Sequence, residues 1–229
     1  MKPLLNLDPI FVVYYLILII SFVIGLFTVT SAKLFYKLVL IQLFAALIAD
    51  GLGTYLQYWL LERNNIWVSN SYILIEFLLY TLAAGSFFFN KVDKRSVAIV
   101  LGLIAAYAIL WSGCVLQNGI STFASLAYTV GGIVICLYFM AITIRHMQQG
   151  TLTMVPKSVK WFAIGTAVYY CCDIPYFSAL PYLNTRYPKT SEMLYSINDI
   201  LNAIRYFIVG ISFLAYRTET KQNSPTIYK

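Results

Sequence analysis

The chain has 229 residues, of which 60% are hydrophobic and 11% are charged, and its formal net charge is +7. A mean hydropathy of +0.75 excludes an ordinary soluble globular domain and indicates an integral membrane protein. Because the basic residues mostly flank apolar runs, we interpret the positive charge as a topology determinant that contacts anionic lipid. We therefore expect the lipid bilayer as a partner and no nucleic acid.

Seven apolar runs of about 20 residues match the roughly 30 Å hydrocarbon core of a bilayer. They predict an all-α membrane protein, a seven-transmembrane-helix bundle in a single domain over residues 1–229, with a short cytoplasmic tail over 217–229. The first run is too long for the apolar core of a signal peptide, and its positive charges follow it, so we expect a retained span. The expected helices cover residues 9–30, 38–61, 71–90, 97–116, 122–144, 160–180 and 193–216.

The lysines and arginines of the connecting segments predict the orientation, because cytoplasmic loops carry an excess of positive charge. Four of them (Lys2, Arg63, Arg186 and Lys189) fall on the side of the N-terminus, whereas eleven fall on the opposite side. We therefore expect a multi-pass protein of the cell (inner) membrane, with the N-terminus outside and the C-terminus in the cytoplasm.

Five ionisable residues lie inside the apolar runs, where charges are costly and usually face a cavity, a partner or a transport path. Helical spacing places tyrosines and asparagines on the same helix faces as the acids. We expect Glu76, Asp173 and Asp199 near the outer ends of their helices, and Asp50 and Arg205 nearer the midplane. The side chains predict a pocket that is entered from the outer side. The candidate ligand-binding or proton-relay residues are Asp50, Glu76, Asp173, Asp199, Asn202, Arg205, Tyr80 and Tyr169.

The charges of these residues separate the ligand classes. One arginine can pair with one or two of four carboxylates, so a surplus of negative charge remains. That surplus favours a cation, an amine or protons, although a neutral hydroxylated solute is also compatible with the tyrosines and asparagines. We predict that the protein binds and translocates a small polar or cationic solute, with proton coupling as one mode.

Three alternatives stay open. An ion pair of Arg205 with Glu76 or Asp199 would serve only to hold two helices together. A seven-helix sensor or accessory subunit would act through a cytoplasmic partner or as a homo-oligomer. A pair of intramembrane acids could also activate water in a lipid hydrolase, although we assign no catalytic residue.

Several classes of site are not supported by the sequence. The single histidine, His146, rules out a His-rich metal site or a Ser-His-Asp triad, so we expect neither a metal nor a cofactor. The helix interiors carry no lysine for a retinal Schiff base. All four cysteines (Cys114, Cys136, Cys171 and Cys172) fall inside predicted helices, and we expect free thiols there.

The second and third helices are similar to the sixth and seventh when the sequence is shifted by 123 residues. The shift pairs Asp50 with Asp173, Arg63 with Arg186, Tyr72 with Tyr195, and Glu76 with Asp199. A duplication would divide the helices into 3+1+3 parallel repeats, an arrangement that resembles the SWEET and PQ-loop carriers. Their Pro-Gln motif is missing from the first and fifth helices, so the resemblance concerns topology alone.

A second resemblance covers most of the chain. Asn65 and Trp67 in a polar turn, followed by Tyr72 and Glu76 on the next helix, resemble a group of uncharacterised bacterial seven-helix membrane proteins. The segment 196–202 is similar to their last helix. This resemblance implies the fold and no particular activity.

Overall fold

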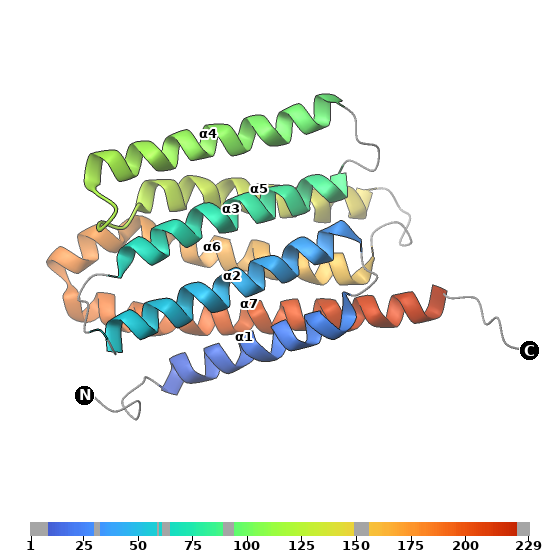
Figure 1. Ribbon diagram of the computed structural model, residues 1–229, viewed down its shortest axis with the longest axis horizontal. Coiled ribbons are helices and arrows are strands. Elements are labelled where there is room, and N and C mark those ends of the chain that lie inside the picture. The colour runs from blue at the N-terminus through green and yellow to red at the C-terminus, as the bar shows by residue number, and fades with distance from the viewer. Residues whose placement is uncertain are drawn as a thin grey trace, which may run out of the picture.

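The computed structural model describes residues 9–29, 33–58, 60, 65–88, 94–148 and 156–223. These residues form seven helices and no strand, which confirms the all-helical fold. The helices alternate in direction along one bundle (Figure 1). We call the end at which α1 begins the N-terminal end and the opposite end the C-terminal end. The helices are α1 (Pro9–Thr28), α2 (Leu34–Tyr58), α3 (Ile66–Phe88), α4 (Lys94–Asn118), α5 (Ser125–Gln148), α6 (Lys157–Arg186) and α7 (Pro188–Asn223).

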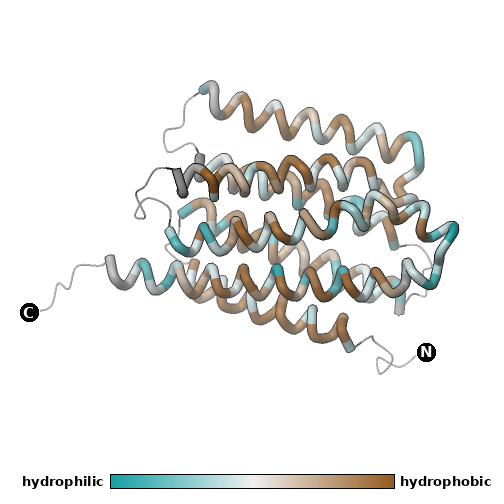
Figure 2. The backbone as a smooth tube through the Cα atoms, turned by 180° about the vertical axis from the view of Figure 1, so that it is seen from behind, coloured by the Kyte–Doolittle hydropathy of each residue, from teal (hydrophilic) through white to brown (hydrophobic). Residues whose placement is uncertain are grey.

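Six of the described helices are long and apolar enough to cross a membrane, and the remaining one is α6. Asp173, Pro175, Pro181 and several tyrosines lower the hydropathy of α6. Large apolar side chains cover the outside of the bundle: Leu116 is 85% exposed and Phe27 is 77% exposed. Figure 2 shows apolar residues along the length of the helices and hydrophilic residues gathered toward their ends. Such a surface is typical of a bundle that is surrounded by lipid rather than water.

Six helices form a closed ring in the order α1, α2, α3, α5, α6, α7, with α7 packed against α1. α4 lies outside the ring against α3 and α5 (Figure 1). Within the triplet α1–α3 the middle helix packs against both of the others, and the same is true of the triplet α5–α7. The two triplets are therefore arranged alike around the ring.

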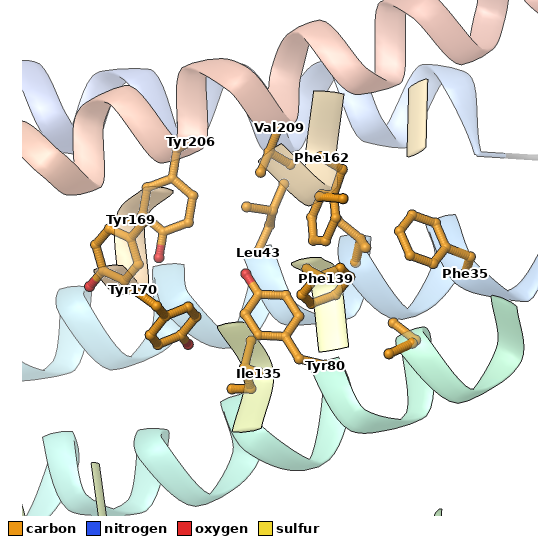
Figure 3. Close-up of a cluster of buried hydrophobic side chains, with 14 of the residues drawn as sticks. Phe35, Leu43, Tyr80, Ile135, Phe139, Phe162, Tyr169, Tyr170, Tyr206 and Val209 are labelled. Carbon is orange, nitrogen blue, oxygen red and sulfur yellow. The ribbon is translucent and has the colours of Figure 1, made fainter. Parts of the chain in front are cut away.

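Aromatic side chains fill the ring toward the C-terminal end. The ring of Phe162 has its centroid 5.3 Å from that of Phe35, 5.2 Å from that of Phe139 and 5.8 Å from that of Tyr80. Figure 3 shows these rings together, with Tyr169, Tyr170 and Tyr206 on the opposite side of the cluster from Phe35. This packing fills the interior of the bundle between the three tyrosines and the C-terminal end.

Hydrogen bonds hold the same end of the bundle together. The Ser158 hydroxyl at the start of α6 donates to Glu219 of α7 over 2.8 Å. The Ser212 hydroxyl donates to the Ser158 carbonyl oxygen, also over 2.8 Å, and Tyr36 of α2 contacts the Ser158 hydroxyl. Three helices are thus tied by polar contacts at the C-terminal end.

The sixth and seventh helices are longer than the sequence predicts. Residues 181–192 were expected as a connector, but they are helical except for Tyr187, and α7 begins at Pro188. Proline is well suited to the first turn of a helix, because the amide it lacks would have no partner there. α7 also continues to Asn223, so the first part of the expected tail is helical, and residues 224–229 lie outside the described part. Hydropathy indicates which part of a helix is apolar enough to lie within the hydrocarbon core. It does not indicate where the helix begins or ends.

Candidate functional site

A cavity of about 410 Å³ lies inside the ring toward the N-terminal end. Gln57, Asn65 and Asn184 line it near the end of the bundle, and Glu76 and Arg205 line it at depth. All six helices of the ring, or the residues next to them, contribute to the lining, whereas no described residue of α4 does. The volume falls within the range of sites that bind small molecules.

Arg205 of α7 forms the floor of the cavity and is only 2% exposed. Its guanidinium makes a buried ion pair with Glu76 of α3 and donates a hydrogen bond to the Tyr80 hydroxyl. Its Cζ atom lies 4.3 Å from the ring centroid of Tyr169, 5.2 Å from Tyr80, 5.3 Å from Tyr206 and 5.4 Å from Tyr170. Rings at these distances attract a cation, so the tyrosines offset part of the cost of burying the guanidinium.

Glu76 accepts further hydrogen bonds from α2 and from its own helix. The Tyr72 hydroxyl donates to Glu76 Oε1 over 3.1 Å, and Gln42 Nε2 lies 3.4 Å from the same oxygen. Gln42 Nε2 also donates to the Tyr72 hydroxyl over 2.7 Å. Because Arg205 and Glu76 neutralise each other, the floor of the cavity is polar but carries no net charge.

Asp50 of α2 is the second acid that lines the cavity. It is half-buried and accepts a hydrogen bond from the Tyr14 hydroxyl of α1. Among the described residues Asp50 has no basic partner, since the one ion pair found there is that of Arg205 with Glu76. An ionised Asp50 would therefore place an uncompensated negative charge on the cavity wall.

Asp173 of α6 is fully buried behind two tyrosines of the lining. The Tyr128 hydroxyl of α5 donates to Asp173 Oδ2, and the Tyr169 hydroxyl lies 3.4 Å from that of Tyr128. Asp173 Oδ1 has no partner among the described residues. In each triplet, then, the middle helix carries an acid that a tyrosine of the first helix contacts: Asp50 with Tyr14, and Asp173 with Tyr128.

The structure brings five of the eight predicted site residues together around the cavity and leaves three outside its lining. Tyr80 lies behind Arg205, Asp173 lies behind Tyr128, and Asp199 is half-buried on α7 without lining the cavity. The residues that line it are Asp50, Glu76, Asn202, Arg205 and Tyr169.

The predicted depths of the acids were wrong in one respect. Glu76 lies ten residues beyond Ile66, the first residue of α3, whereas Asp50 lies eight residues before Tyr58, the last of α2. Glu76 is therefore deeper than Asp50, the reverse of the expected order. The reason is that α3 begins five residues before its predicted start at residue 71 and α2 ends three residues before its predicted end at residue 61.

Sequence reasoning missed several lining residues. Tyr14 and Tyr128 contact the two aspartates, but a single tyrosine in an apolar helix looks the same as a packing residue. Asn184 was assigned to a connector because the sixth helix was expected to end at residue 180. When the first two helices are paired antiparallel, Tyr14 lies nearly opposite Asp50. This pairing is the one sequence pattern that could have identified Tyr14 as a lining residue.

Within the described residues, no group of three or more histidines, cysteines, aspartates or glutamates is placed to hold a metal ion. Comparisons of the chain with models of known protein families, with curated proteins and with solved structures find no match.

Proposed function

We propose that this protein crosses the membrane with all seven helices, binds a small polar solute that carries a positive charge, and translocates it. The observation that carries the proposal is the placement of Asp50: its carboxylate faces a cavity of about 410 Å³ and has no basic partner among the described residues. A bound cation would supply the missing charge.

The rest of the lining favours an organic cation over a bare metal ion. Phe11, Tyr14 and Tyr195 present aromatic rings to the cavity, and such rings attract ammonium groups. Asn198 and Asn202 offer amide groups that can orient the polar part of a solute. Arg205 would not repel the cation strongly, because Glu76 holds its charge. An amine with hydroxyl or amide groups meets all these features.

The arrangement of the two triplets supports translocation in addition to binding. Carriers that are built from parallel repeats place the solute between the two halves and open to each side in turn. Here the triplets α1–α3 and α5–α7 pack alike, and each carries one Tyr–Asp contact on its first two helices. The cavity reaches toward the N-terminal end, while Phe162 and the contacts of Ser158 close the C-terminal end. We place the N-terminal end outside, because the basic residues gather at the other end.

Uptake into proteoliposomes tests the translocation step. Vesicles with the wild-type protein should take up some members of a panel of labelled amines, and should exchange them for unlabelled amine. Asp50→Asn should abolish this uptake. Binding of an amine by the wild type without any uptake or exchange would contradict translocation and favour a receptor that acts through a partner.

A further inference from the structure

A second, much smaller cavity lies beside Glu76 and is lined by residues of α3, α4, α5 and α6. The volume open to a water-sized sphere is about 10 Å³, close to the space that a single water molecule requires. Glu76 lines both cavities, and Tyr107 of α4, Tyr128 of α5 and Tyr170 of α6 also line the small one. Its lining residues are all buried.

Two hydroxyl groups of residues that line this cavity have no partner among the described residues. The Tyr107 side chain is 4% exposed and that of Tyr170 is 1% exposed, and neither hydroxyl makes a hydrogen bond to a described residue. A buried hydroxyl without a partner destabilises the folded state, so natural proteins seldom leave two of them beside one space. Each can donate one hydrogen bond and accept others.

Close packing fixes both tyrosines against the cavity. The Tyr107 ring stacks on Phe77 with a centroid distance of 3.7 Å, and a Cβ atom added at Gly131 would lie 2.9 Å from the Tyr107 hydroxyl oxygen. A Cβ atom at Gly132 would lie 3.0 Å from Cδ1 of Tyr170. The two glycines let the tyrosines approach the backbone of α5 at this point.

We propose that one ordered water molecule occupies this cavity and links Tyr107, Tyr170 and Glu76. Two hydroxyls and a carboxylate provide the two to four partners that a buried water needs. The water ties α4 and α6 to the carboxylate that already binds α7 through Arg205. It gives α4, which lies outside the ring, a polar connection to the floor of the main cavity.

Charge decides between water and a small cation as the occupant. Glu76 already forms an ion pair with Arg205, so an added sodium ion would leave a net positive charge buried among aromatic rings. Two hydroxyls and one carboxylate also provide fewer oxygen ligands than a hard cation usually takes. A neutral water molecule meets neither difficulty.

The sign of a stability change tests the inference. If water bridges the hydroxyls, Tyr107→Phe and Tyr170→Phe should each lower the melting temperature, by roughly 2–4 °C, and the double variant should lose less than the sum because both share one water. If the cavity is dry, each variant removes a hydroxyl without a partner, and the melting temperature should rise or stay the same. Tyr182→Phe, which changes a residue that is 59% exposed, is the matched control and should have no effect.

Infrared difference spectroscopy identifies the occupant directly. In the wild type, exchange of H₂¹⁶O for H₂¹⁸O should shift an O–H stretching band of a buried water, and the band should be missing from the double variant. A raised or unchanged melting temperature for either single variant, or the absence of an isotope-sensitive band that differs between wild type and double variant, would overturn the inference. Loss of stability when sodium is replaced by potassium, measured in an Asp50→Asn background, would likewise overturn it in favour of a cation. None of these readouts depends on the solute of the main cavity.

Discussion

Arg205 and Glu76 are 129 positions apart in the chain and form a buried ion pair that joins α7 to α3. Taking two charges out of water is costly, and the pair persists because other groups compensate for that loss. Tyr72 and Gln42 lie within hydrogen-bonding distance of the carboxylate, and four tyrosine rings surround the guanidinium. The pair therefore both fastens two helices of the ring and forms the floor of the main cavity.

Breaking this pair from one side should strongly destabilise the protein. Glu76→Gln leaves the Arg205 charge buried without a counter-charge, and we expect a loss of about 3–5 kcal/mol in the free energy of unfolding. Replacing both residues, as in Glu76→Gln with Arg205→Met, should recover part of that loss, because no uncompensated charge remains. Thermal unfolding in one detergent compares both variants with the wild-type protein.

The control for the charge pair is Arg186→Gln, since Arg186 is exposed at the end of α6 and should tolerate the change. If Glu76→Gln melted at the temperature of the wild type, the ion pair would contribute nothing to folding. The description of the cavity floor as a buried ion pair of Arg205 and Glu76 would then be wrong.

Asn70 should be a second position of high sensitivity, although it forms no part of the ion pair. Its side-chain amide donates to the carbonyl oxygens of Ile120 over 2.8 Å and Thr122 over 2.9 Å, and its oxygen accepts from the Ala124 amide over 3.0 Å. Asn70→Ala removes all three hydrogen bonds, including the one from the buried amide of Ala124, and should lower stability by about 2–4 kcal/mol.

Asn118→Ala is the matched control for Asn70, because that side chain is exposed and makes one local hydrogen bond of 3.2 Å to Cys114 O. Unfolding of the two variants should differ clearly, with Asn118→Ala close to the wild type. Equal melting temperatures would mean that Asn70 does not hold the α4–α5 turn against α3.

The sequence was a good guide to the helices and to some of the polar groups, for a physical reason. Long apolar runs predict helices, and ionisable residues such as Asp50, Glu76 and Arg205 stand out because they are rare within such runs. The ring order of the helices cannot be predicted in this way, because it depends on lateral packing between distant segments. Tyr14 and Tyr128 were missed because tyrosine is common in this chain, which has 19 of them.

The position of α4 and the start of α7 show a further limit. By hydropathy alone, α4 is a candidate membrane-spanning helix like those of the ring. The structure nevertheless places it outside the ring. The polar segment before residue 193 was expected as a loop, but local hydrogen bonds make it part of α7. The 123-residue repeat also stays a prediction, which the like packing of the two triplets supports.

The packing of α5 against α6 can be checked with the native cysteines. The sulfur atoms of Cys136 and Cys171 are 3.5 Å apart, although both thiols are free. Mild oxidation with copper phenanthroline should join them, so that two fewer thiols react with a maleimide afterwards. Cys172→Ser should behave like the wild type, whereas Cys171→Ser should lose the effect. The opposite pattern would mean that α6 is rotated relative to this packing.

The most direct test of the proposed function is native mass spectrometry of the gently solubilised protein with the panel of amines. The wild type should retain an amine, and Asp50→Asn should bind it at least about tenfold more weakly. Asp199→Asn, which removes an acidic side chain of α7 outside the cavity lining, should keep most of the affinity. If Asp50→Asn bound every amine as tightly as the wild type, Asp50 would not be the binding group and the proposed role of the cavity would be wrong.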